Sequence, residues 1–146
     1  MFFGIAIATI ICDQLSKWII VHLFSSPLSL PVIPSVFHLT LVYNRGAAFG
    51  LFPGAHLFFI GISLCVVAGI LYYRKSLLEE GFYSVLGYAL ILGGAIGNLI
   101  DRIRLKAVID FLDFRIWPVF NIADSAICVG VFFLILCFLF SFKKAQ

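Results

Sequence analysis

The sequence predicts an all-α membrane protein, a bundle of four transmembrane helices with a small β-sheet at one end. Of the 146 residues, 63% are hydrophobic and only 12% are charged, and the mean hydropathy is +1.15. Soluble domains are typically about half apolar and about one quarter charged. This chain has too little polar surface to fold in water, which excludes a soluble enzyme and a nucleic-acid-binding protein.

Four apolar runs are long enough to cross a bilayer, which needs about 20 apolar residues in a helix. Every backbone polar group in lipid must be bonded within the protein, which favours helices for all four runs. We expect one membrane-embedded domain, residues 1–146, with both termini on one side. Basic residues lie on both sides, so charge alone does not fix the orientation. The expected spans are about 2–24, 55–73, 82–100 and 119–142.

The connection between the first two spans predicts β-structure at the membrane surface. Phe37, Leu39, Leu41 and Tyr43 alternate with other residues, so they share one face at the period of a strand. We expect a strand pair or small sheet within about residues 30–52, with a turn at Asn44-Arg45-Gly46.

Polar side chains cluster where the predicted helices approach one membrane face. An ionisable group inside a bilayer costs several kcal/mol, so each one needs a partner or a function. Two carboxylates at converging helix ends could form an aspartic protease pair, in which one ionised acid activates water and one protonated acid polarises the substrate carbonyl. The set comprises Asn98, Asp101, Arg102, Asp110, Asn121 and Asp124, with Asp13 and Lys17 placed mid-span in the first helix.

Other chemistries have weaker support. The three histidines stand alone and no HExxH motif is present, so a zinc protease is not favoured. We expect no metal and no organic cofactor. The alternative is a small proton- or ion-coupled transporter, in which the intramembrane acids would line the path.

The chain carries five further motifs, which are DQLSKW at 13–18, NRGAAFG at 44–50, GGAIGNLIDR at 93–102, VIDF at 108–111 and FNIADS at 120–125. In this order they resemble the motifs of the lipoprotein signal peptidase family (signal peptidase II). The resemblance implies an aspartic endopeptidase of the bacterial inner membrane that removes signal peptides from diacylglyceryl-modified prolipoproteins. It also implies cytoplasmic termini, an active site near the outer leaflet, an extracytoplasmic β-cradle and inhibition by globomycin-type cyclic peptides. We expect membrane lipid as a further partner, no nucleic acid, and a monomer.

Asp110 and Asp124 are the expected catalytic pair. The apolar neighbours of Asp110 would raise its pKa, as a general acid requires, and the VxDF motif of the family falls on it. Asp124 lies three residues after Asn121, so it also fits a helix capping box, where the helix N-terminus would favour its ionised form. Asp101 is the alternative second acid, and Asp113 is expected to be a surface loop residue.

The remaining candidates bind substrate or support the pair. Arg102 could hold peptide carbonyls or a phosphate, or it could be an interface arginine with no such role. Asp13 and Lys17 form an i,i+4 pair, expected to be a structural strut that bonds the Asn44–Gly46 turn. Asp101 lies three residues after Asn98 and next to Arg102, and it is expected to support the site by orienting its neighbours through a charge-assisted bond. The expected substrate-binding residues are Asn44, Gly46, Asn98, Arg102 and Asn121.

Overall fold

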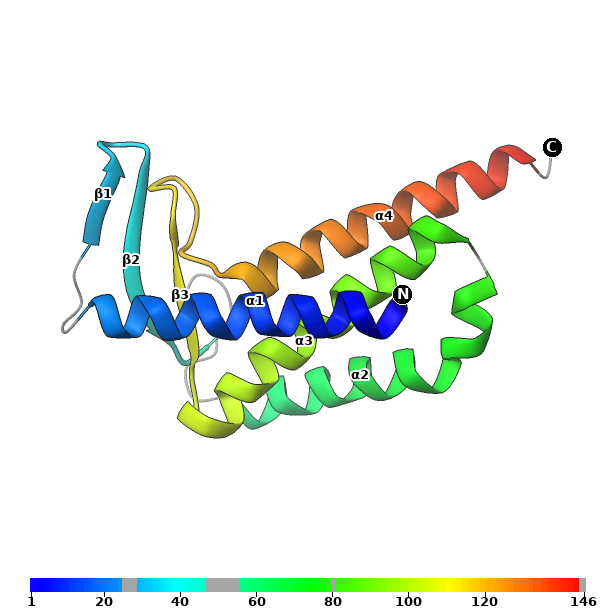
Figure 1. Cartoon of the computed structure of the whole chain (residues 1–146), viewed down its shortest axis with the longest axis horizontal. Helices are drawn as coiled ribbons and strands as arrows, with labels where there is room; N and C mark the ends of the chain where they lie inside the picture. Colours follow the sequence, from blue (N-terminus) through cyan, green and yellow to red (C-terminus); the bar gives the residue numbers. More distant parts are fainter. Residues whose placement is uncertain (25–28, 47–55, 80, 145–146) are drawn as a thin grey trace.

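The computed structural model describes residues 1–24, 29–46, 56–79 and 81–144, and it confirms the predicted fold class. Within these ranges, four helices are long and apolar enough to cross a membrane, and they are joined by loops and strands (Figure 1). Residues 47–52 of the predicted sheet region lie outside the described residues. The elements are α1 (Phe2–Leu23), β1 (Ser29–Ile33), β2 (Phe37–Asn44), α2 (His56–Glu79), α3 (Phe82–Leu105), β3 (Val108–Asp113) and α4 (Ile122–Lys144).

Helices α2 and α3 extend beyond the apolar stretches from which they were predicted. The sequence placed their ends near residues 73 and 100, whereas the structure ends them at Glu79 and Leu105. Hydropathy detects only the part of a helix that matches the hydrocarbon core, and charged residues continue the helix into the interface. The extension of α3 keeps Asp101 and Arg102 on a helix, so their side chains have fixed directions.

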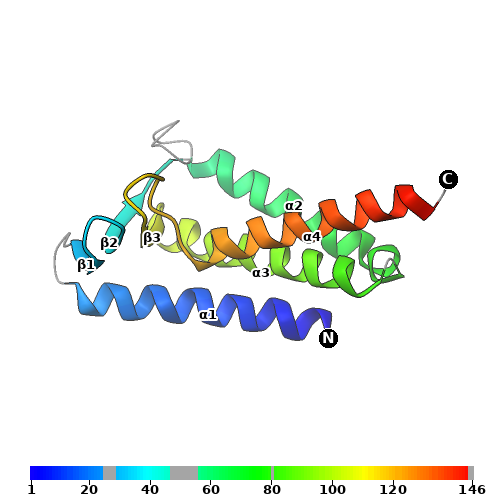
Figure 2. The same cartoon turned by 90° about the horizontal axis from the view of Figure 1, so that it is seen from above.

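Helix α3 is the centre of the bundle and packs against each of the other three helices (Figure 2). In its most apolar stretch 61% of the residues are buried, against 28% for α1, 11% for α2 and 17% for α4. Small residues allow this close packing, because a Cβ on Gly93 would lie 2.6 Å from Thr9 Cβ of α1 and one on Gly94 would lie 2.5 Å from the Ala123 carbonyl oxygen of α4. Buried glycines of this kind are typical of membrane helix interfaces.

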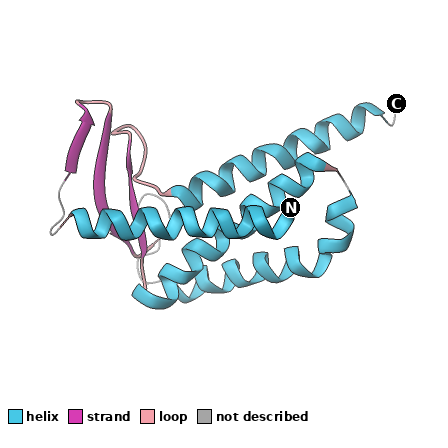
Figure 3. Ribbon diagram, in the orientation of Figure 1, coloured by secondary structure: helices cyan, strands magenta, loops and turns pink. Residues whose placement is uncertain are grey.

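A three-stranded antiparallel sheet, in the order β1-β2-β3, covers the end of the bundle opposite the two termini (Figures 1 and 3). Its inner face is apolar: Leu41 of β2 and Ile109 and Phe111 of β3 pack against Ile20 and Phe24 at the end of α1. The sheet therefore holds β3 against the helix ends.

The sequence analysis missed β3. Five of its six residues are buried, so the run Val108–Asp113 lacks the alternation by which β2 was predicted. Its pairing with β2, for example Tyr43 opposite Ile109, joins segments more than 60 residues apart. Short apolar runs of this kind cannot be assigned by periodicity alone.

Asp113 was predicted to be a surface loop acid, and this was wrong. It ends β3 with a buried side chain, which accepts hydrogen bonds from Thr40 Oγ1 (2.8 Å) and from the Arg115 backbone N–H (2.9 Å) and guanidinium (3.1 Å). Burial alone would raise the pKa of this carboxyl, but the three hydrogen bonds outweigh it and hold the pKa below its usual value. Asp113 thus fastens β3 to β2.

Substituting Gly94 tests the close packing of α3 on α4. In Gly94→Ala the new methyl group would meet the Ala123 carbonyl and Ile127, so α4 must shift, which we expect to lower the free energy of unfolding by about 1–3 kcal/mol. Thermal unfolding of the full chain in detergent micelles measures the change. Gly61→Ala on α2 is the matched control, because nothing lies within 4 Å of its added Cβ; equal midpoints for the two variants would contradict the packing.

Candidate active site

The two predicted acids meet where β3 and α4 come together. Asp110 is the third residue of β3 and is 2% exposed, whereas Asp124 is half-buried in the first turn of α4. Asn121 joins them: its Nδ2 donates to Asp110 Oδ1 (2.7 Å), and its backbone N–H donates to Asp124 Oδ2 (3.3 Å). The Asp124 backbone N–H returns a bond to Asn121 Oδ1 (2.9 Å). The capping box is therefore present, and the same residues link the two acids.

Three asparagine amides point their NH₂ groups at the acids. Asn44 Nδ2 donates to Asp110 Oδ2 (2.9 Å), and Asn98 Nδ2 donates to Asp124 Oδ1 (2.8 Å). Each amide is oriented by a group that can only donate: the Gly46 N–H bonds Asn44 Oδ1 (3.0 Å), the Lys17 ammonium bonds Asn98 Oδ1 (3.1 Å), and the Asp124 N–H bonds Asn121 Oδ1. Because a donor must face an acceptor, none of the three amides can flip without losing a bond.

The environment of Asp110 suits a proton donor at neutral pH. Burial is the largest influence, and the nearby charge of Asp124 adds to it; hydrogen bonds from Asn44 and Asn121 oppose both. The net effect raises the pKa of Asp110 to about 7. Two interacting carboxyl groups, one deeply buried and one half-buried, can hold a single proton between them and so supply an acid and a base together.

Arg102 of α3 faces the acids. Its side chain is half-buried, its charge interacts with Asp124, Asp110 and Asp101, and its guanidinium carbon lies 5.4 Å from the ring centroid of Phe59 on α2. A cation over an aromatic face is held in place at low cost. The structure therefore puts a positive charge beside the acids.

Asp13 and Lys17 do not bond the Asn44–Gly46 turn, and that expectation was wrong. Lys17 Nζ contacts Asp13 Oδ2 (2.9 Å) and Asp101 Oδ2 (2.7 Å), so α1 is tied to α3. Although the sequence places these two residues near the middle of α1, they belong to the same polar cluster as the acids. Sequence spacing gives the i,i+4 pair but not its partner on another helix.

Asp101, the alternative second acid, already has partners on both oxygens. Its Oδ2 accepts from Lys17 and from the Ile109 backbone N–H (3.2 Å), and its Oδ1 accepts from Gln14 Nε2 (3.1 Å). A carboxylate whose two oxygens already have partners inside the protein is poorly placed to bind and activate a water molecule. Gln14 itself was given no role by the sequence analysis; the signal available was a polar residue next to Asp13 within an apolar helix.

Comparisons with known proteins identify the family. The model of the Signal peptidase (SPase) II family matches residues 5–140. The chain belongs to the signal peptidase II family. The lipoprotein signal peptidase of Halothermothrix orenii is 46% identical to it over 136 residues, which cover 93% of both chains, and that of Moorella thermoacetica is 50% identical over 136 residues, covering 93% of this chain and 89% of its own.

Solved structures agree with the family assignment. A bacterial membrane enzyme solved by the in meso method at 2.3 Å matches 99% of this chain and 91% of its own with a TM-score of 0.90 and 33% identity. A second, solved at 1.9 Å, matches 94% of this chain and 92% of its own with a TM-score of 0.83 and 35% identity. The resemblance inferred from the five motifs is thus confirmed, and membership of the signal peptidase II family favours a membrane protease over the transporter alternative.

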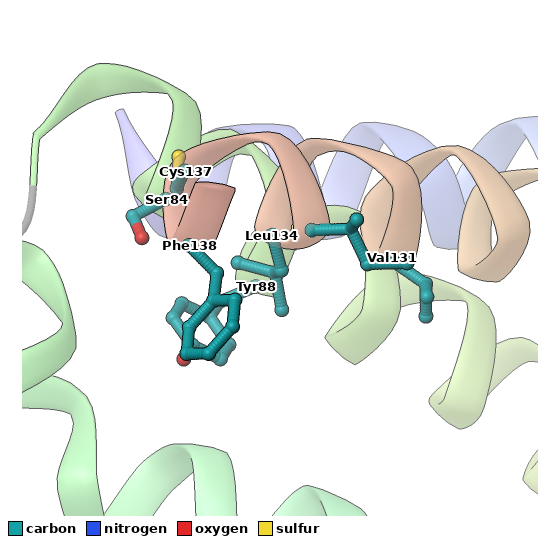
Figure 4. A pocket seen from close by; sticks show the side chains of 7 residues that line it. Ser84, Tyr88, Val131, Leu134, Cys137 and Phe138 are labelled. Atoms are coloured by element: carbon teal, nitrogen blue, oxygen red, sulfur yellow. The ribbon is translucent and has the colours of Figure 1, made fainter. Parts of the chain in front are cut away.

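A groove in this signal peptidase II chain lies away from the acids. It has a volume of about 600 Å³ between the first turns of α3 and the second half of α4, and Tyr88 and Phe138 are among the side chains that line it (Figure 4). It is largely apolar, and the titratable groups of the site do not line it. Within the described ranges, no three His, Cys, Asp or Glu side chains are arranged to hold a metal ion.

The raised pKa of Asp110 predicts how stability depends on pH. Between about pH 4 and 7 the folded chain holds a proton that the unfolded chain has lost, so the free energy of unfolding should fall as pH rises, by at most about 1.4 kcal/mol per pH unit, and level off above pH 7. Denaturation in detergent across this range, compared between the wild type and Asp110→Asn, measures the difference. Equal pH slopes for the two proteins would contradict the assigned pKa.

Proposed function

We propose that this chain is an aspartic endopeptidase that removes signal peptides from lipidated lipoprotein precursors, with Asp110 and Asp124 as the catalytic pair. Family membership supports the protease activity and the class of substrate. The observation that carries the catalytic assignment is the position of Asn121, whose side-chain amide bonds Asp110 and whose backbone N–H bonds Asp124 at the sheet end of the bundle. The whole chain, residues 1–146, would act as a single peptidase domain, since the site draws on α1, β2, α3, β3 and α4.

The different surroundings of the two acids suggest their roles. Asp124 is half-buried, is reached more readily by water, and lies at a helix N-terminus, where a negative charge is favoured. It would take a proton from the attacking water while Asp110 gives its proton to the scissile carbonyl oxygen. The resulting diol would collapse when Asp124 passes its proton to the departing amine and Asp110 recovers one from the diol hydroxyl. No metal is needed in this scheme.

The groups around the pair fit an extended peptide. Arg102 supplies a positive charge beside the acids, and the Asn44–Gly46 turn at the end of β2 supplies backbone groups next to Asp110. The side-chain amides of Asn44, Asn98 and Asn121, which were expected to bind substrate, bond the acids instead. They would therefore shape the pair, while Arg102 and the backbone of Asn44 and Gly46 line its approach.

We further infer that the termini are cytoplasmic and that the acids lie near the outer leaflet. Basic residues lie at both ends of the bundle, with Arg74 and Lys75 at the end that holds the termini and Arg104 and Lys106 at the sheet end, so their positions do not decide the orientation. The orientation is proposed from the resemblance to the lipoprotein signal peptidase family. A diacylglyceryl group held in the leaflet would then set the depth of the cleavage point. Because one chain carries both acids, a monomer would suffice.

The catalytic pair can be tested by replacing each acid with its amide. Asp110→Asn and Asp124→Asn should each lower kcat for a fluorogenic peptide carrying a diacylglyceryl-cysteine by about 1,000-fold or more, because the acid or the base is lost. Purified full-length protein in lipid nanodiscs is assayed, with thermal unfolding to show that each variant is folded.

Asp113→Asn is the matched control, because it makes the same change in the same strand at a carboxylate that faces Thr40 and Arg115. It should retain kcat, and a globomycin-type cyclic peptide should inhibit it as it does the wild type. Cleavage by Asp110→Asn at the wild-type rate would move the catalytic role to Asp101. Proton flux through wild-type proteoliposomes that do not cleave the peptide would instead support a transporter.

The orientation can be tested with fusions to the C-terminus. A green fluorescent protein placed there should fluoresce in bacteria, and an alkaline phosphatase at the same position should be inactive, because the first works only in the cytoplasm and the second only outside it. An active phosphatase fusion would reverse the proposed orientation.

A further inference from the structure

Lys17 is the largest fully buried side chain among the described residues, at 2% exposure, yet the proposed reaction does not use it. Its ammonium group contacts three acceptors on two helices: Asp13 (2.9 Å), Asp101 (2.7 Å) and Asn98 Oδ1 (3.1 Å). An ammonium group has three protons, so every one has a partner. Such a group has one favourable position, and it fixes its neighbours.

We propose that Lys17 is a positioning residue for the catalytic pair: it ties together two carboxylates, Asp13 and Asp101, each of which holds the backbone N–H just before one of the catalytic aspartates. The inference rests on the proposed function and adds an explanation of what fixes the distance between the two catalytic aspartates.

The first arm runs from Asp13 to Asp124. Asp13 Oδ1 accepts a hydrogen bond from the Ala123 backbone N–H (3.0 Å), in the first turn of α4 and one residue before Asp124. Asp13 is wholly buried and can reach this position only because Gly97 of α3 has no side chain: a Cβ there would lie 2.5 Å from Asp13 Oδ2. Asp13 thus fixes the start of α4 relative to α1.

The second arm runs from Asp101 to Asp110. Asp101 Oδ2 accepts from the Ile109 backbone N–H (3.2 Å), one residue before Asp110 in β3. The Ile109 carbonyl accepts from Asn121 Nδ2 (3.2 Å), so its backbone is held on both sides. Asp101 thus fixes β3 relative to α3.

Lys17 joins Asp13 to Asp101 and so links the two arms, and the uncharged side chain of Gln14 bridges the same two carboxylates. Gln14 Nε2 lies 3.1 Å from Asp13 Oδ2, Asp101 Oδ1 and the Gly97 carbonyl. Lys17 also turns the Asn98 amide so that its NH₂ group faces Asp124. If the Lys17 link is cut, both arms keep their backbone bonds, but only the uncharged Gln14 bridge still spans the distance between them.

Stability alone does not account for this arrangement. Burying an ion pair costs desolvation that the attraction between the charges often fails to recover, and apolar replacements of such clusters are frequently neutral or stabilising. Positional precision does account for it, since a displacement of about 1 Å of reacting groups can lower a rate about 100-fold.

The test must remove the Lys17 link without leaving the two carboxylates that it pairs as unpaired buried charges. Lys17→Met alone leaves two buried carboxylates unpaired, so the decisive protein is the triple variant Asp13→Asn, Lys17→Met, Asp101→Asn. Its amide oxygens can still accept the Ala123 and Ile109 N–H groups, so the arms remain while the link is lost. We expect kcat for the diacylglyceryl-cysteine peptide to be about 100-fold lower, with KM unchanged and the thermal midpoint closer to that of the wild type than in Lys17→Met.

Gln14→Leu is a milder second variant, because Gln14 is half-buried and uncharged. It should lower kcat about tenfold with KM unchanged, and it keeps the proposal testable if the triple variant does not fold. Asp113→Asn, which removes a buried carboxylate of β3 outside this link, serves as the control and should keep its kcat.

The proposal would be overturned if the triple variant had the kcat of the wild type, or if Gln14→Leu left kcat unchanged. The cluster would then be a purely structural feature. A failure of the proposed function is distinguishable, because it would appear as full cleavage by Asp110→Asn whatever the Lys17 variants do.

Discussion

Polar groups inside this bundle cannot rely on water, and the whole site is organised by that constraint. Within the part of the chain that the structure describes, the buried carboxylates, amides and ammonium group near the sheet end all have partners inside the protein. In a medium of low dielectric each such bond is strong and each missing one is costly. The hydrogen bonds and ion pairs of this network are therefore expected to form and break together. A helix shift that breaks one contact leaves a buried group unsatisfied, so the network resists displacement as a unit.

Helix α3 makes such a network possible. Its glycine face brings the backbones of α1 and α4 close enough for short side chains to bridge three helices: Gly97 admits Asp13, and Gly94 admits the carbonyl of Ala123. Without that approach, Asp13 could not reach the first turn of α4. The glycines that bring the helices together thus also set the distances in the polar network.

Much of the fold follows from local patterns, and much of the site does not. Continuous hydropathy predicts the helices, alternation predicts β2, and the spacing of Asn121 and Asp124 predicts the capping box. By contrast, β3 is buried along most of its length, so its sequence shows no alternation. Asp113 meets its partner Thr40 only once β2 lies beside β3. Lys17 pairs with Asp101, 84 positions away in the sequence, and not with the Asn44–Gly46 turn. Each miss is a contact between segments distant in sequence, about which periodicity carries no information. The motifs did bring Asp110 and Asp124 forward, and the assignment of their roles is still a proposal.

The bond between Asp13 and the Ala123 N–H joins residues 110 positions apart. Asp13 on α1 leaves the ribosome well before α4 is made. The bond that fixes the first turn of α4 to α1 can consequently form only after α4 has been inserted. A chain interrupted before α4 would carry Asp110 without Asp124, so under the proposed function an unfinished copy would not cleave its neighbours in the membrane.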